Sequence, residues 1–122
     1  MSRRRQALGR YGERTARSHL ERRGYTILES NYRTRTGEVD LVTEQNGVLA
    51  FVEVRTLRGA KLGSPEESIT ERKRSRLVAL AQEYLQAHNI EDAEWRIDVV
   101  ALELDSRGRL VRLDVIENAV EV

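Results

Sequence analysis

The sequence predicts one α/β domain of 122 residues, in which a helix is followed by three strands, a second helix and two more strands. Three observations predict this class. Two long stretches carry apolar residues at the three-to-four spacing of an amphipathic helix. An Asn-Gly pair separates two short apolar segments, which is the strongest local sign of a β-hairpin. Two segments with alternating polar and apolar residues close the chain.

The first helix is predicted over residues 4–23, because Leu8, Ala16 and Leu20 fall on one apolar stripe and Gly24 follows as a helix-ending glycine. The second helix is predicted to end near His88 and has two candidate starts. Its first candidate start is Ser64, which precedes a proline and two glutamates, and its second is Thr70.

Two residues on these helices could face a site between helix and sheet. Glu13 lies beside the apolar stripe of the first helix, where it either reaches over the sheet edge or pairs with a surface arginine. Lys73 lies one turn before Leu77 on the apolar stripe of the second helix, so it either extends into solvent or points towards the sheet. Gly9 and Gly12 are unfavourable inside a helix and either fray its first turn or allow another backbone to approach.

Five segments have the composition of strands, and a basic turn at residues 33–37 and a basic loop at residues 56–63 are expected between elements. The predicted strands are residues 25–32, 37–42, 51–55, 95–104 and 110–116. Asn46-Gly47 predicts that the second and third of these strands pair antiparallel.

Charged residues interrupt the apolar middle strands at Asp40, Glu53 and Arg55. Side chains alternate along a strand, so Glu53 and Arg55 project from the same face. An unpaired buried carboxylate is strongly unfavourable, which favours a bound divalent cation. A salt bridge between Asp40 and Arg55 explains the same pattern, and the two strands alone leave both interpretations open.

Two further acids have a structural alternative. Glu38 shares a face with Asp40 and is either another carboxylate of the site or a solvent-exposed strand start, and we favour the exposed position. Asp98 either supports the site from behind or pairs with a nearby arginine, Arg96 or Arg112.

Composition and charge limit the function classes. The chain has no cysteine, which excludes disulfides, thiolate metal sites and a cysteine nucleophile. No apolar run approaches the roughly 18 residues of a membrane span, and no secretory signal follows the basic start, so we expect a cytoplasmic protein without a membrane partner. Net charge is only +1, but residues 1–23 hold eight arginines and two glutamates, which suits either phosphate binding or a solvated helix face.

The order of elements, with Glu13 on a helix, Asp40 on a strand and Glu53-Val54-Arg55 on the next, resembles the restriction-endonuclease-like superfamily of nucleases. The chain resembles the bacterial YraN-type family more closely, from about Leu8 to Ala119. The residues that carry this closer resemblance are Gly12-Glu13, Gly24-Tyr25, Ile27-Leu28, Asn31, Arg33, Gly37-Glu38-Val39-Asp40-Leu41-Val42, Phe51-Val52-Glu53-Val54-Arg55, Lys73, Ala81, Tyr84-Leu85, Ile97-Asp98-Val99-Val100 and Asn118-Ala119. The resemblance implies a central, mixed five-stranded sheet flanked by helices.

It also implies roles for the charged residues. Asp40, Glu53 and Glu13 would bind Mg²⁺ or Mn²⁺, and Arg55 stands where the superfamily usually has lysine. An arginine stays protonated and cannot act as a base, although it can stabilise charge that develops on a phosphate. Lys73 would then supply the missing amine.

The expected reaction is metal-dependent endonucleolytic cleavage of DNA, selective for branched or damaged structures. By analogy with such nucleases, we also expect a homodimer, in which the second copy supplies a second site. Basic side chains would contact the phosphates. The residues expected to do so are Arg10, Arg14, Arg17, Arg33, Arg35, Arg58 and Lys61. Two alternatives are a nucleic-acid-binding module with little or no cleavage and a protein-interaction domain.

Overall fold

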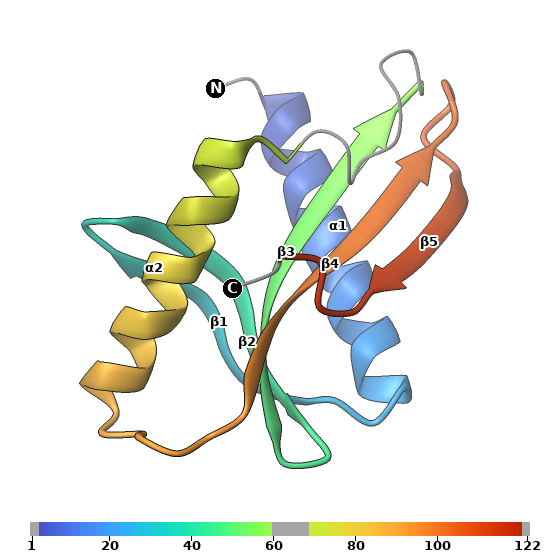
Figure 1. Ribbon diagram of the computed structural model, residues 1–122. Helices are drawn as coiled ribbons and strands as arrows, with labels where there is room; N and C mark the ends of the chain where they lie inside the picture. Colours follow the sequence, from blue (N-terminus) through green and yellow to red (C-terminus); the bar gives the residue numbers. More distant parts are fainter. Residues whose placement is uncertain (1–2, 60–68, 121–122) are drawn as a thin grey trace.

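The computed structural model describes the backbone of residues 3–59 and 69–120, and the side chains from Ala7 onward within these ranges. Its elements follow the predicted order of helix, three strands, helix and two strands (Figure 1). They are α1 (Arg3–Arg22), β1 (Thr26–Thr34), β2 (Gly37–Gln45), β3 (Val48–Arg58), α2 (Glu71–Ala87), β4 (Trp95–Leu104) and β5 (Leu110–Ile116).

The five strands form one mixed sheet in the order β1-β2-β3-β4-β5. Neighbouring strands pair antiparallel except β3 and β4, which are parallel. A parallel pair needs a crossover connection, and α2 lies within the crossover between β3 and β4. This mixed five-stranded sheet confirms the predicted fold class.

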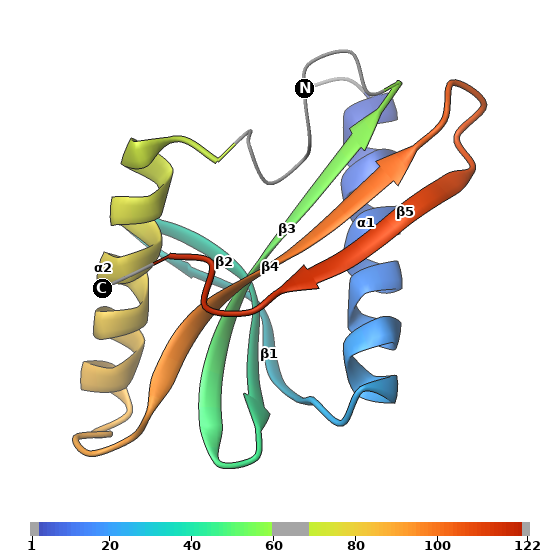
Figure 2. The same ribbon diagram turned by 45° about the vertical axis from the view of Figure 1, so that its right-hand side comes forward.

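The two helices cover opposite faces of the sheet, which gives three layers (Figure 2). On the α2 face, Leu77, Leu80 and Tyr84 pack with Phe51 and Ile97 in one buried cluster. On the α1 face, the buried cluster is formed by Ala16, Leu20, Tyr25, Leu41, Ala50, Val52, Val100 and Leu102. Both helices therefore use the apolar stripes that their sequences predict.

Turn residues confirm the local predictions. Asn46 and Gly47 have φ angles of 53° and 80°, as a tight hairpin with a primed turn requires. Gly24 has a φ of 89° after the last turn of α1. Thr70 is the N-cap of α2, because its hydroxyl oxygen accepts a hydrogen bond from the Lys73 amide. The alternative start at Ser64 lies outside the described residues.

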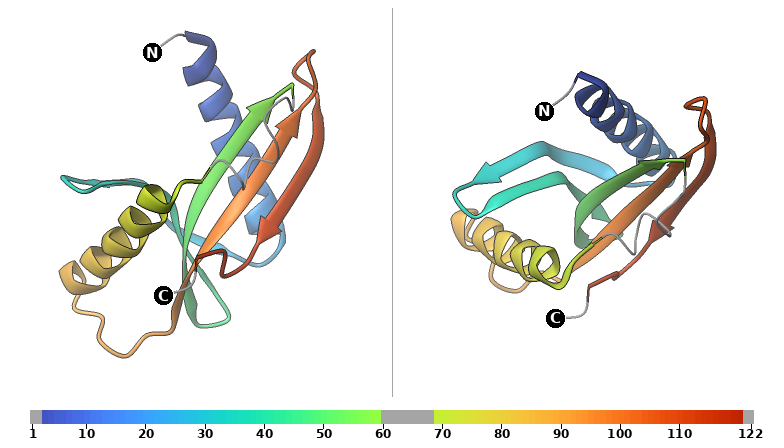
Figure 3. Two further views of the ribbon diagram at one scale, coloured as in Figure 1. Left: turned by 45° about the horizontal axis from the view of Figure 1, so that its top comes forward. Right: turned by 90° about the horizontal axis from the view of Figure 1, so that it is seen from above.

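The sheet divides between β2 and β3. Their pairing ends where Leu41 faces Val52, whereas β1 and β2 continue to Thr34 opposite Gly37, and β3 and β4 continue to Arg58 opposite Leu104. Figure 3 shows the β1–β2 hairpin turning away from β3, β4 and β5. We call the opening between the two halves the fork.

Two predicted loops are shorter than expected. Thr56, Leu57 and Arg58 belong to β3, because they pair with β4, so the prediction of a loop from Thr56 was wrong at these residues. Residues 60–63 of the same predicted loop lie outside the described residues. Arg33 and Thr34 also belong to a strand, since they pair with Glu38 and Gly37.

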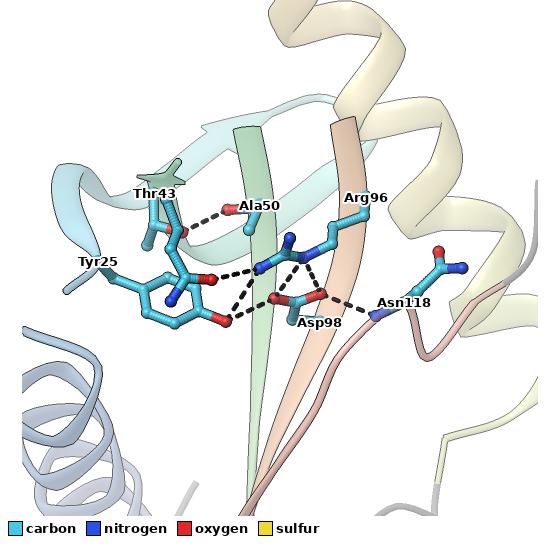
Figure 4. Close-up of polar contacts among 7 residues, drawn as sticks. Tyr25, Thr43, Ala50, Arg96, Asp98 and Asn118 are labelled. Atoms are coloured by element: carbon cyan, nitrogen blue, oxygen red, sulfur yellow. Dashed lines mark hydrogen bonds and ion pairs between the residues drawn. The ribbon is translucent and has the colours of Figure 1, made fainter. Parts of the chain in front are cut away.

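Asp98 takes the structural alternative. It is fully buried and accepts hydrogen bonds from the Arg96 guanidinium, the Tyr25 hydroxyl and the Asn118 amide (Figure 4). These partners come from the residue before β1, from β4 and from the segment after β5, and none of the three is Glu13, Asp40 or Glu53. The prediction that Asp98 pairs with Arg96 is confirmed. Neither described helix combines the length and apolar character of a membrane-spanning helix.

Candidate functional site

Three carboxylates meet at the fork. Glu13 comes from α1, and Glu38 and Asp40 come from β2. One oxygen from each of these three side chains lies within 4.8 Å of the other two. We call these three residues the acid cluster. Glu38 and Asp40 share a face because they are two residues apart on a strand.

The packing of α1 on β3 brings Glu13 to the cluster. Gly12 is buried against Thr56 and Val54, and a Cβ atom at this position would overlap the Thr56 hydroxyl. Gly9 has no neighbouring atom within 4 Å of such a Cβ, so only Gly12 makes the close approach. The glycine therefore brings the backbone of the following residue, Glu13, close to the strand.

Asp40 occupies the fork itself. Its Oδ2 atom accepts a 2.7 Å hydrogen bond from the Val54 amide, just beyond the last β2–β3 pair. The side chain thus replaces a backbone partner that Val54 loses when the strands separate. Asp40 is thereby tied to β3 as well as to β2.

Glu53 lies next to Asp40 and is only 5% exposed. Its carboxylate forms a 3.3 Å ion pair with the Lys73 ammonium on α2. The structure therefore brings Asp40, Glu53, Glu13 and Lys73 together, and Asp40 is the member of the acid cluster that lies next to the Glu53–Lys73 pair. Lys73 points towards the sheet, as the second of its two predicted positions requires, rather than into solvent.

Mutual repulsion and burial shift the pKa values of two acids. Burial raises the pKa of Asp40 well above its ordinary value, and the nearby charge of Glu53 raises it further. The hydrogen bond from Val54 opposes this shift of the Asp40 pKa. Burial also raises the pKa of Glu13, while a hydrogen bond from Asn31 acts in the opposite direction. The cluster therefore resists carrying its full negative charge without a compensating cation.

Asn31 on β1 connects two of the acids. Oriented with its amide nitrogen towards them, it donates hydrogen bonds to Glu13 (3.1 Å) and Glu38 (2.5 Å). Its backbone has a φ of 54°, a left-handed conformation that asparagine tolerates better than most residues. Arg33 also contacts the cluster, through a 3.4 Å ion pair with Glu38.

Beside the cluster lies an open pocket of about 890 Å³ between α1 and β3. Glu13, Asp40, Glu53 and Arg55 line it together. Glu53 and Arg55 thus face the same space, as their spacing predicts. Three of the carboxylate residues and Arg55 therefore border the same open pocket.

The predicted phosphate-binding residues are divided among several surfaces. Arg10 and Arg14 are exposed on α1, and Arg35 is exposed at the β1–β2 turn. Arg17 is exposed but donates a hydrogen bond to Ser30 of β1. Two others are exposed with partners of their own. Arg33 pairs with Glu38, and Arg58 donates two hydrogen bonds to the Ser106 carbonyl. Lys61 lies outside the described residues.

Sequence reasoning favoured the wrong position for one residue of the site and gave another residue no role. Glu38 is only partly exposed and belongs to the acid cluster, so its interpretation as a solvent-exposed strand start was wrong. Its alternation with Asp40 was the available signal. Asn31 was named only among the residues of the family resemblance, because its contacts with Glu13 and Glu38 join separate elements and leave no local pattern.

Fold and site together define a class of protein: an α/β domain whose mixed sheet opens at a fork lined by carboxylates. The chain belongs to Uncharacterised protein family UPF0102, the YraN family, whose family model matches residues 12–102. The matched region includes Glu13, Asp40, Glu53 and Lys73.

Relatives cover nearly the whole chain. The UPF0102 protein of Roseiflexus castenholzii is 47% identical over 122 residues, which are 99% of this chain and 98% of the relative. That of Pelotomaculum thermopropionicum is 46% identical over 115 residues, 94% and 96% of the two chains. That of Chloroflexus aurantiacus is 46% identical over 114 residues, 93% and 92% of the two chains. These names state a family and no reaction.

Proposed function

We propose that this chain is a metal-dependent endonuclease that hydrolyses phosphodiester bonds of DNA and selects branched or damaged DNA by its structure. The observation that carries the proposal is the acid cluster, which lies beside Glu53, Lys73 and Arg55 at an open pocket. Asp40 and Glu13 have pKa values raised by burial and by neighbouring acids, and such groups beside an open pocket are characteristic of functional sites.

The donor atoms fit a hard divalent cation. All three groups of the acid cluster offer carboxylate oxygens, which Mg²⁺ and Mn²⁺ prefer. Glu13, Glu38 and Asp40 would hold the ion, and Glu53 is the adjacent fourth carboxylate. When bound, the ion would lower the pKa of a water molecule and neutralise phosphate charge.

The chain's own residues would position the substrate. The Val54 amide fixes the Asp40 carboxylate by a hydrogen bond, and the Lys73 ammonium holds the buried Glu53 carboxylate by an ion pair. Arg55 would stabilise negative charge on the phosphate, since a guanidinium keeps its proton. The exposed Arg10 and Arg14 would contact the backbone on either side. Such contacts carry no base information, which supports selection by DNA structure.

A binding module without cleavage is the second candidate, and Arg55 is the observation that favours it. A lysine at this position would present a compact charge that can orient water, whereas the planar guanidinium suits phosphate binding. This candidate predicts DNA binding that survives the loss of Asp40.

The test is cleavage of single-stranded, duplex, flap and four-way-junction DNA with Mg²⁺ or Mn²⁺. Wild type should cleave at least one of them, and Asp40→Asn and Glu53→Ala should each lose about 100-fold or more in rate. Glu44→Ala is the matched control, because Glu44 is an exposed acid on β2 that pairs opposite Leu49, outside the fork. Absent cleavage with junction binding intact in Asp40→Asn would establish the binding module instead.

A further inference from the structure

The outer edge of β5 carries apolar residues at the surface. Among the described residues, the large hydrophobic side chains classed as exposed are Leu28, Leu110 and Val111, and two of these three belong to β5. Val111 is the most exposed, at 61%. In the described sheet, β5 has a neighbour on one side only. An open edge presents unpaired backbone groups that can pair with another strand.

The edge is regular around Leu113. From Arg112 to Ile116, β5 pairs with β4 residue by residue, and the bulge at Val111 precedes this stretch. The opposite edge of the sheet differs, because β1 has a left-handed residue at Asn31 in addition to its own register shift between Ile27 and Glu29. Bulges and twists discourage edge pairing, so β5 is the better template.

The sequence of β5 is complementary to itself. Residues directly opposite each other in an antiparallel pair point to the same face. A two-fold axis perpendicular to the sheet therefore lies midway between the two strands, at a residue that faces its own copy. An axis at Leu113 places Leu113 opposite its own copy and Arg112 opposite Asp114 of the second copy. An axis at Arg112 or at Asp114 would instead oppose two like charges, which is destabilising.

Charge and exposure support the axis at Leu113. Arg112 already pairs with Asp114 and Glu103 of its own chain, at 2.7 and 2.9 Å. The Asp114 side chain keeps 52% of its surface exposed, so it can accept a second guanidinium. A second copy would therefore join two existing ion pairs into one network, while Val111 would gain an apolar neighbour.

We propose that β5 pairs antiparallel with β5 of a second copy about a two-fold axis at Leu113, which gives a homodimer with one continuous sheet. The partner strand is β5 of a second copy rather than an unrelated strand, because Arg112 and Asp114 on one β5 face Asp114 and Arg112 on the other. Both copies then present their α1 faces on the same side. The inference is independent of the proposed nuclease activity.

Cysteine scanning tests the register in the full chain, which has no cysteine of its own. Opposed Cα atoms lie about 4.5–5.5 Å apart, within disulfide range, so Leu113→Cys copies should cross-link on mild oxidation. Val111→Cys is the control, because its two copies would be about 13 Å apart at 3.3 Å per residue. Val111 is more exposed, so random collisions would favour the control. Equal or faster cross-linking of Val111→Cys would overturn the proposal.

Charge-reversal variants test whether the partner is a second copy of the chain. Wild type should have twice the 14.0 kDa chain mass by light scattering at tens of micromolar. Arg112→Glu and Asp114→Lys copies should each be monomers, since each opposes like charges, and their equimolar mixture should form a heterodimer. Both variants break the Arg112–Asp114 ion pair inside the chain. If this ion pair served only the stability of each copy, mixing the two variants would not cause them to associate. A monomeric wild type, or a mixture that stays monomeric while both variants melt cooperatively, would overturn the proposal.

Discussion

Asp40 serves two purposes with one side chain. Its carboxylate holds the Val54 amide, and the same group faces Glu53 and the other acids of the cluster. The first purpose stabilises the fork, whereas the second raises the pKa of Asp40 and opposes its ionisation. The site is therefore least favourable when it is fully charged and has no cation.

The first prediction concerns this conflict. Mg²⁺ or Mn²⁺ should raise the melting temperature of wild type, because a cation that binds only the folded chain adds about 2.7 kcal/mol at 100 times its Kd. Asp40→Asn keeps the shape of the side chain but removes one charge, so it should abolish the rise and melt higher than wild type in chelator. Differential scanning fluorimetry with and without chelator measures both effects. An undiminished metal-induced rise in Asp40→Asn would remove Asp40 from the metal centre.

At this scale, strand alternation identified part of the site. Asp40 and Glu53 stood out because they interrupt apolar strands, and Glu13 because it borders a helix stripe. Glu38 was misplaced because a strand end next to a basic turn is usually solvated, whereas the Glu13 carboxylate of α1 lies within 4.8 Å of it here. The position of Glu13 depends on contacts between α1 and β3, which a local pattern does not contain.

The acid cluster depends on the contact between two elements, α1 and β3. Gly12 lies against Thr56, and the next residue of the helix is Glu13. Any side chain at position 12 would push the helix away from the strand. Glu13 would then leave Glu38 and Asp40.

The second prediction compares the two glycines of α1. Gly12→Ala should lower the free energy of unfolding by about 1–3 kcal/mol through overpacking, and should weaken the metal-induced rise in melting temperature. Gly9→Ala meets no atom and should stabilise the helix by about 0.5–1 kcal/mol. Urea denaturation measures both. Thr56→Ala should partly rescue Gly12→Ala, and a Gly12→Ala variant as stable as wild type would contradict the close approach.

The third prediction concerns the buried polar contacts that tie the strands together. Tyr25 donates a 3.1 Å hydrogen bond to Asp98, and burial together with the Asp98 charge raises the pKa of Tyr25 above 10.0. Tyr25→Phe should therefore lower stability by about 1 kcal/mol at neutral pH.

The pH dependence of this effect has a definite sign. Because the folded pKa of Tyr25 lies above the unfolded one, its contribution is complete below pH 10 and is lost as the pH rises through the folded value. The difference between wild type and Tyr25→Phe should thus shrink above pH 10 in urea titrations. Tyr11→Phe is the control, since Tyr11 makes no polar contact among the described residues, and a Tyr25→Phe difference that grows with pH would contradict the raised pKa.

Elements with local signals were predicted closely. The segments 95–104 and 110–116 match β4 and β5, because alternation and a short turn specify an antiparallel pair. The end of β3 was missed because Thr56–Arg58 pair in parallel with β4. Their partner strand, β4, lies about 45 residues further along the chain, beyond α2, so no local sequence pattern predicts the pairing.

Over the whole molecule, charge is nearly balanced but unevenly placed. The net charge is +1, yet the region up to residue 23 holds an excess of six positive charges. Nucleic-acid affinity of such a protein should come from this helix rather than from overall charge, and should fall steeply with salt.

The fourth prediction measures that contribution. Arg10→Gln with Arg14→Gln should weaken binding to junction DNA and reduce the slope of log affinity against log salt by about 2, or about 0.9 for each lost phosphate contact. Arg22→Gln with Arg23→Gln, at the other end of the helix, is the matched control. Fluorescence anisotropy across a salt series gives the slopes, and equal slopes for the two double variants would exclude Arg10 and Arg14 from the interface.

The single parallel pair of strands also sets an order of assembly during synthesis. Glu13, Asn31, Glu38, Asp40 and Glu53 all precede the crossover that leads to β4. Hairpins close in about 1–10 μs, whereas ribosomes add only about 5–20 residues per second. The nascent β1–β2–β3 segment can therefore sample the fork before β4 emerges. Lys73 lies on α2, between β3 and β4 in the chain, so its ammonium reaches Glu53 only after all the acids of the fork have been synthesised.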